Sequence, residues 1–262
     1  MQSARLDSQE LTDLPIWLAD HRDLMHLSVY DNALTTLPDW LWSLTELRTL
    51  NVAANRLMRL SDKIGALQQL RMLDLGHNRI MALPEALGAL PALTDFLYLS
   101  DNQLERLPLS LTKLTTLRYL NISDNQLRTL PDDLGQMTSL IELRAYRNPL
   151  AALPDSIGEL VRLRELHFDH TLLTGLPESL GKLGDLRVLS LRGCRLASVP
   201  ASIGALCQLR HLDLRGNGLA TLPDEIAALP RLEKLDLRWN SQLTRLPSWI
   251  EAVETRGCVV YV

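Results

Sequence analysis

The chain has 262 residues, a formal net charge of −4 and a hydrophobic fraction of 46%. An acidic balance without a basic stripe argues against a partner made of nucleic acid. No apolar run approaches the roughly 18 residues that a membrane helix requires, and the first residues lack the apolar core of a secretory signal.

The cysteines are few and odd in number: Cys194, Cys207 and Cys258. Such usage indicates a reducing compartment, so we expect a cytoplasmic protein, with delivery into a host cell by a non-Sec route left open. Only four of the 27 basic residues are lysines. That bias fits either a GC-rich genome or the avoidance of ubiquitin acceptor sites inside a host.

One pattern, L-x-x-L-x-L-x-x-N-x-L-x-x-L-P, recurs along the whole chain, as in residues 117–131. Its asparagine position recurs every 23 residues, apart from one step of 24, and is filled by Asn32, Asn55, Asn78, Asn102, Asn125, Asn148, Thr171, Cys194, Asn217 and Asn240. A fixed period in the twenties indicates a solenoid, in which each unit packs on its neighbours.

The predicted elements follow this period from the amino end. Residues 1–23 are predicted to be a degenerate first unit, with Gln9 in the asparagine position. In every later unit the L-x-L alternation predicts a short strand whose leucines point inward. A proline followed by an acidic residue, as in Pro177-Glu178, predicts the start of a helix of about two turns.

The carboxyl end is expected to close the solenoid. After Pro247, residues 248–254 are predicted to be helical, and residues 258–262 are predicted to lie on the last unit as a strand. Residues 248–262 would then be a C-terminal cap. We therefore expect a single domain over residues 1–262, with about 11 units.

Two units are one residue too long, near Phe96 and near Ser241. The extra residue near Phe96 predicts either a β-bulge that kinks the sheet among its aromatic residues or a silent surface insertion.

The continuation L-P-x-x-I-G-x-L, as in residues 153–160, resembles the 23-residue class of leucine-rich repeat, and the resemblance covers essentially the entire chain. That class is found in bacterial repeat proteins, including effectors delivered into host cells, and in eukaryotic intracellular scaffolds that bind Ras-type GTPases. The resemblance implies an α/β fold: a right-handed solenoid, or horseshoe, with a parallel β-sheet on the concave face. Short helices or 3-10 turns would lie on the convex face.

The asparagine series is expected to satisfy buried backbone groups, because an amide both donates and accepts hydrogen bonds. Thr171 and Cys194 have poorer hydrogen-bonding capacity, so they are either tolerated substitutions or a functional hinge. Cys194 is predicted to point into the stack, which argues against a role as a nucleophile.

The repeat register predicts which side chains face solvent: positions 3, 5, 7 and 8, counted from the first leucine of the pattern. These columns collect aromatic and charged residues, which are the types that anchor protein interfaces. The predicted partner-binding residues on the concave face are Tyr30, Phe96, Tyr98, Tyr119, Glu142, Arg144, Tyr146, Glu165, His167, Asp169, Arg192, Arg215, Arg238 and Trp239. Alternatively, the aromatic residues only suit strands and the charges form a solvated lattice.

Catalytic motifs are missing: the chain has no H-E-x-x-H, no phosphate-binding glycine loop, no G-x-S-x-G and no C-x-x-C. We expect no enzyme and no cofactor. His167, Asp169 and His170, with Glu142 and Glu165, could hold a divalent metal, but the site would be shallow and open. A hydrogen-bonding patch is preferred there, so no metal is predicted.

The sequence therefore predicts a non-catalytic, monomeric module that binds a protein or peptide. One alternative is the substrate-recognition part of a host-directed effector of the ubiquitin-ligase type. Another is a structural protein that self-associates through its amino end, where the sequence shows no cap comparable to residues 248–262.

Overall fold

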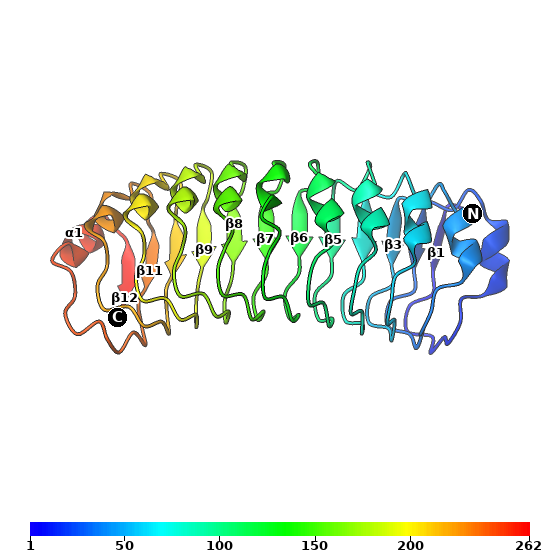
Figure 1. The fold of residues 1–262 in the computed structure, drawn as a ribbon, viewed down its shortest axis with the longest axis horizontal. Helices are drawn as coiled ribbons and strands as arrows, with labels where there is room; N and C mark the ends of the chain where they lie inside the picture. The colour runs from blue at the N-terminus through cyan, green and yellow to red at the C-terminus, as the bar shows by residue number, and fades with distance from the viewer. The chain divides into compact units, whose positions relative to one another are not determined.

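A computed structural model describes residues 1–262. The chain divides into two compact parts, each made of several repeats. They are called unit 1 (Met1 to Gln126) and unit 2 (Leu127 to Val262) from here on. In each unit, short parallel strands form one row and 3-10 turns form another (Figure 1). The expectation of a single domain over residues 1–262 stays a prediction.

Unit 1 alternates strands and turns along the chain. Its strands are β1 (Ser3–Arg5), β2 (His26–Ser28), β3 (Thr49–Asn51), β4 (Met72–Asp74), β5 (Phe96–Tyr98) and β6 (Tyr119–Asn121). Its 3-10 turns are η1 (Ile16–Asp20), η2 (Asp39–Ser43), η3 (Asp62–Ala66), η4 (Glu85–Ala89) and η5 (Leu109–Lys113).

Unit 2 continues the same alternation and ends with an α-helix and a strand. Its strands are β7 (Glu142–Arg144), β8 (Glu165–His167), β9 (Val188–Ser190), β10 (His211–Asp213), β11 (Lys234–Asp236) and β12 (Val259–Tyr261). Its turns are η6 (Leu134–Gln136), η7 (Asp155–Glu159), η8 (Glu178–Lys182), η9 (Ala201–Ala205) and η10 (Asp224–Ala228), and its α-helix is α1 (Ile250–Thr255).

The strands have the inward and outward sides that the L-x-L alternation predicts. Successive side chains of a strand point to opposite faces, so in β1 to β10 the central residue of each three-residue strand is buried and its neighbours are not. Leu50 in β3 and Leu166 in β8 are fully buried, and the residues on either side of each keep partial exposure. The core is built almost entirely from these leucine columns, with Phe168 as the largest fully buried side chain.

Neighbouring strands pair in the register set by the period. His26 pairs with Thr49 in unit 1, and Glu142 pairs with Glu165 in unit 2. The extra residue near Phe96 does not disturb this register, because Met72 pairs with Phe96 and Phe96 pairs with Tyr119. It lies before β5, where the Asp95 N–H donates to the Arg71 carbonyl at 3.0 Å. The predicted bulge within the sheet is therefore wrong, and the insertion is accommodated in the loop.

The elements opposite the strands are 3-10 turns. A 3-10 helix rises about 2.0 Å per residue, against about 1.5 Å in an α-helix, so it spans the layer with fewer residues. The proline precedes the turn and has extended geometry, as at Pro177 (φ −71°, ψ 147°), and η8 begins at Glu178. The Pro177 carbonyl accepts the first hydrogen bond of the turn, from the Leu180 N–H at 3.0 Å.

The asparagine series forms the predicted ladder of backbone hydrogen bonds. The Asn125 side-chain amide donates to the carbonyls of Leu99, Ile122 and Ser123, and its oxygen accepts from the Leu104 N–H. These hydrogen bonds join one turn of the solenoid to the next. Where the ladder is interrupted, the Thr171 hydroxyl and the Cys194 thiol lie 3.2 Å apart, and the thiol donates to the Phe168 carbonyl.

Not every position predicted to face solvent does so. Ala53 and Ser123, both at position 7, are buried because small side chains lie below their larger neighbours. Asp236, at position 5 of β11, has no exposed surface because two arginines cover its carboxylate.

After Pro247 the chain forms α1, and β12 then pairs with β11 through Leu235 and Val260. Val253 of α1 is buried against this end of the unit. No helix of the chain is both long enough and apolar enough to span a membrane.

Candidate functional site

Unit 1 carries a cluster of three aromatic rings on the exposed face of its sheet, formed by Phe96, Tyr98 and Tyr119 (the aromatic patch). Phe96 and Tyr98 are the first and third residues of β5, so they share a face. Their ring centroids lie 5.5 Å apart, and those of Phe96 and Tyr119 lie 4.8 Å apart in a stacked pair. The Arg118 guanidinium lies 5.7 Å from the centre of the Tyr119 ring. All three rings are half-buried, so part of each ring remains open to a partner.

Strand β4 borders the aromatic patch with one apolar and one acidic side chain. Met72 pairs with Phe96, and Asp74 pairs with Tyr98. Burial raises the pKa of the Asp74 carboxyl, although a hydrogen bond from the Gly76 N–H at 3.0 Å acts in the opposite direction. A cationic group of a partner placed here would be attracted to a carboxylate that is poorly solvated.

Tyr30 lies apart from the aromatic patch, two residues after the end of β2, and its side chain is exposed. Its N–H donates to Asp7 at 3.0 Å, and the Ser28 hydroxyl donates to the same carboxyl oxygen at 2.5 Å. Burial would raise the pKa of Asp7, but these hydrogen bonds and Arg5 outweigh burial and lower it. The backbone of Tyr30 is therefore well anchored, while its ring makes no contact with the three patch rings.

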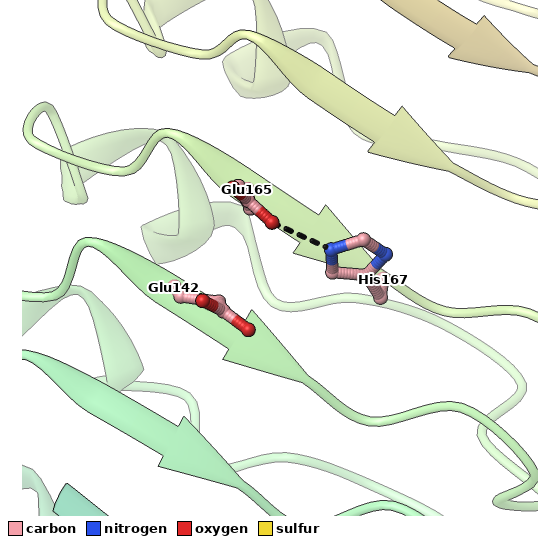
Figure 2. Close-up of side chains that lie close together, drawn as sticks. All are labelled: Glu142, Glu165 and His167. Atoms are coloured by element: carbon pink, nitrogen blue, oxygen red, sulfur yellow. Dashed lines mark hydrogen bonds and ion pairs between the residues drawn. The ribbon is translucent and has the colours of Figure 1, made fainter.

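In unit 2, strands β7 and β8 bring two glutamates and a histidine together. Potential ligand atoms of Glu142, Glu165 and His167 all lie within 4.8 Å of one another, and Figure 2 shows them gathered on one face of the two strands. His167 Nε2 lies 3.3 Å from Glu165 Oε2. The Arg144 Nε–H donates to the Glu142 carboxylate, which compensates the repulsion between two glutamates paired across the strands.

This acidic cluster is smaller than the metal-binding set considered from sequence. Asp169 and His170 lie beyond the end of β8 and do not join the other three residues. A divalent cation would have to compete with Arg144 for Glu142, on a face without a surrounding shell of supporting ligands. The contacts favour the hydrogen-bonding interpretation.

Four other residues predicted to bind a partner lie around one hollow in unit 2. Tyr146, Asp169, Arg192 and Arg215 line one hollow of about 340 Å³, together with Arg147, His170 and Ser190. The hollow lies at the ends of β7 to β10, where the chain leaves the sheet.

The last two predicted residues, Arg238 and Trp239, belong to a charge lattice near the carboxyl end that also includes Arg215 of the hollow. Arg215 binds Asp213 through Nη2 at 2.5 Å, and Arg238 binds Asp236 through Nη2 at 2.6 Å. Burial would raise the pKa of Asp236, but the hydrogen bonds and charge of Arg238, together with the charge of Arg215, hold it below its usual value. Trp239 is exposed, and the Arg238 guanidinium lies 5.9 Å from the centre of its ring.

Comparison with known families agrees with this architecture. A model described as leucine-rich repeat region matches residues 58–154, and one described as leucine-rich repeat matches residues 208–229. A leucine-rich-repeat protein of Leptospira interrogans matches with a TM-score of 0.81 and 28% identity, over 100% of this chain and 72% of the other. The chain is a leucine-rich-repeat protein.

Other solved leucine-rich-repeat structures share the fold. The ectodomain of the plant receptor kinase GASSHO1/SCHENGEN3 from Arabidopsis thaliana, in complex with CASPARIAN STRIP INTEGRITY FACTOR 2, matches with a TM-score of 0.77 and 25% identity. The match covers 99% of this leucine-rich-repeat protein and 38% of the receptor ectodomain. An internalin of Listeria monocytogenes matches with a TM-score of 0.61 and 17% identity, over 100% of this chain and 86% of the internalin. No curated protein matches the sequence.

Some neighbours of the site in this leucine-rich-repeat protein were not predicted. Tyr261 of β12 lies next to the charge lattice, with its ring centre 4.9 Å from the Arg238 guanidinium. The sequence places Tyr261 in the terminal strand, outside the repeat register, so no periodic position identifies it. Met72 and Asp74 stood in the outward columns, but only their pairing with β5 makes them the border of the aromatic patch.

Proposed function

We propose that this leucine-rich-repeat protein is a non-catalytic interaction module that binds a protein or peptide through the exposed face of its sheet. The aromatic patch of unit 1 provides the main anchor, and Asp74 favours a cationic group next to that anchor. The single observation that carries the proposal is the stacked, half-buried arrangement of Phe96, Tyr98 and Tyr119.

The fold supports the general class of function. Leucine-rich-repeat structures are typical of protein–protein interaction modules, and similar structures include a plant peptide hormone receptor in complex with RGF2 and the GASSHO1/SCHENGEN3 ectodomain in complex with CASPARIAN STRIP INTEGRITY FACTOR 2. One fold hosts many functions, however, so the specific function is inferred from the residues of the site.

The chemistry of the aromatic patch supports partner binding. Tyrosine and other aromatic residues offer a large contact area with few rotatable bonds, and they are enriched among the residues that dominate binding energies. The three rings already restrain one another, because Phe96 contacts both tyrosines. A partner would therefore lose less side-chain entropy on binding to them than on binding to isolated rings.

The surroundings of Cys194, the cysteine of the asparagine series, argue against a role of this residue as a nucleophile. Cys194 is buried, and burial raises the pKa of its thiol, which reduces the fraction of reactive thiolate. The thiol also donates to the Phe168 carbonyl within the stack.

The proposal is tested with the double variant Tyr98→Ala/Tyr119→Ala. A partner captured from lysate with the wild-type chain is purified, and its affinity is measured by calorimetry for each variant. We expect the double variant to bind at least about tenfold more weakly, since each lost anchor ring costs on the order of 1 kcal/mol or more.

The matched control is Met58→Ala/Met81→Ala, which removes two exposed apolar side chains of unit 1 that lie outside the strands. It should change the affinity less than about twofold. Equal affinity of the wild type and the aromatic double variant, with both folded by circular dichroism, would show that the partner binds elsewhere.

A further inference from the structure

The hollow at the ends of β7 to β10 in unit 2 has the features of an anion site. It has a volume of about 340 Å³ and is lined by Tyr146, Arg147, Asp169, His170, Ser190, Arg192 and Arg215. We propose that it binds a phosphoryl group, either as free phosphate or as a phosphorylated side chain of a partner. This proposal does not depend on the aromatic patch, which lies in unit 1.

The space arises because two successive repeats carry glycine where other repeats carry side chains. Gly193 and Gly216 occupy position 8, with φ +65° in each case, whereas Arg147 and His170 fill the equivalent position in the two preceding repeats. A Cβ atom on Gly193 would lie only 2.5 Å from His170 Nδ1. The His170 ring thus lies over the Gly193 backbone, and any larger residue at position 193 would displace it.

The lining is rich in arginine. The lining contains three guanidinium groups and one carboxylate, that of Asp169, although Arg215 is also paired with Asp213 and Asp236 outside the lining. Asp169 is already engaged, because its Oδ1 accepts from the Ser190 hydroxyl at 2.5 Å and from the Arg192 N–H at 3.0 Å. The Arg192 guanidinium, in contrast, has no carboxylate partner and lies 6.0 Å from the centre of the Trp239 ring.

Donors remain available around the hollow. Arg215 uses Nε and Nη2 to bind Asp213, which leaves Nη1 without a partner. The Tyr146 hydroxyl has no hydrogen-bond partner within the protein, and the same holds for the guanidinium of Arg192. These groups come from three different repeats, so they approach the space from different directions.

This arrangement suits a phosphoryl group better than a carboxylate. A carboxylate presents two oxygens in one plane, which a single arginine can satisfy. A phosphoryl group presents three acceptor oxygens in a tetrahedral arrangement and carries close to two negative charges, so it can use several donors at once. Clustered arginines are a common means of recognising phosphorylated side chains.

The first experiment titrates inorganic phosphate into the full chain by calorimetry, in an amine buffer at constant ionic strength. We expect saturable binding, at least tenfold weaker in Arg192→Gln. Arg195→Gln removes the same charge from an exposed residue outside the hollow and should change the affinity less than twofold. Absence of saturable binding, or equal weakening by both variants, would overturn the proposal. Acetate that binds as tightly as phosphate would also overturn it, because the ligand would then be a carboxylate.

A second pair of variants tests the shape of the hollow. Gly193→Ala should push the His170 ring into the space and weaken phosphate binding at least tenfold. Gly216→Ala is the matched control, since its Cβ would meet only Gly193 Cα, at 3.6 Å, and the two substitutions share the same left-handed backbone. Equal phosphate affinity of the two folded alanine variants would contradict the proposed role of Gly193; if Gly193→Ala does not fold, the arginine pair alone decides.

The source of the phosphoryl group is distinguished with a phosphoserine peptide and the same peptide unphosphorylated. Binding of only the phosphorylated form, at least tenfold tighter than inorganic phosphate and weakened by Arg192→Gln, supports a phosphorylated partner. Similar affinities for the phosphopeptide and inorganic phosphate support the free anion.

Discussion

Phe96 and Tyr119 stack with their ring centroids 4.8 Å apart and their planes inclined by 25°, although 23 residues separate them in the chain. The contact exists because each residue begins a strand and the two strands pair in register. Tyr98 extends the cluster along β5. The repeat period thus converts residues that are distant in sequence into one continuous surface.

Removing the central ring should cost stability as well as binding area. We expect Phe96→Ala to lower the free energy of unfolding by about 1–2 kcal/mol, because the ring is half-buried and stacks on a tyrosine. Urea denaturation measures this difference. The control, Tyr119→Phe, keeps the stacked ring and removes a hydroxyl without a partner in the protein, so its stability should match the wild type. A larger loss in Tyr119→Phe than in Phe96→Ala would contradict the account of the aromatic patch.

Removing one asparagine of the ladder should destabilise the fold more than removing the Phe96 ring. Asn125→Ala removes one acceptor and one donor group that together bind four buried backbone groups. Leaving buried backbone groups unpaired costs on the order of 1–3 kcal/mol for each group, so we expect a loss of at least about 2 kcal/mol. The neighbouring exposed variant Gln126→Ala should lose less than about 0.5 kcal/mol in the same denaturation series.

Asp236 should make the stability of the chain depend on pH. Its pKa is lower in the folded chain than in the unfolded chain, so its ionised form stabilises the fold at neutral pH. This contribution is complete above the unfolded value near pH 4 and is lost as the pH falls through the lower folded value. Asp236→Asn should therefore cost about 1–3 kcal/mol at pH 7, and the difference from wild type should shrink below pH 4.

The measurement for Asp236 is the free energy of unfolding between pH 2.5 and pH 7. Asp185→Asn, which alters an exposed carboxylate of the same unit, serves as the control and should follow the wild-type curve. A constant difference between Asp236→Asn and wild type across this range would argue against the ion pairs with Arg215 and Arg238.

The glycines of the I-G-x-L motif should be intolerant of substitution where the next repeat approaches closely. A Cβ atom on Gly158 would lie 2.2 Å from the Ser179 carbonyl oxygen, so Gly158→Ala must shift the backbone of η8. We expect a loss of about 2–3 kcal/mol in urea denaturation. Gly184→Ala has no atom within 4 Å of its new methyl group and should be neutral or slightly stabilising. Similar stabilities for these two variants would show that the repeats can move apart at low cost.

The sequence was sufficient to predict the repeat, the strand positions and the asparagine ladder, because each follows from a strict period. The exposed face of β5 and β6 was predicted for the same reason, as Phe96, Tyr98 and Tyr119 all occupy outward columns. Which of these predicted residues contact a partner stays a prediction.

Other features depend on local packing that a period does not encode. Asp236 was expected to face solvent, but Arg215 and Arg238 cover it, and the register alone does not determine the rotamers of arginine side chains. The insertion near Phe96 was compatible with a bulge or a loop, and only the backbone hydrogen bond of Asp95 distinguishes them. The contact between Gly193 and His170 depends equally on the orientation of the ring.

Within a strand such as β5, different residues support the fold and face outward, and this separation affects how the protein can evolve. In β5 the fully buried Leu97 supports the fold, while Phe96 and Tyr98 on either side of it face outward. Mutations that alter what the surface recognises therefore seldom coincide with positions that hold the chain together. Replacing outward residues one at a time can therefore change the ligand at a smaller cost in stability than replacing the buried leucines.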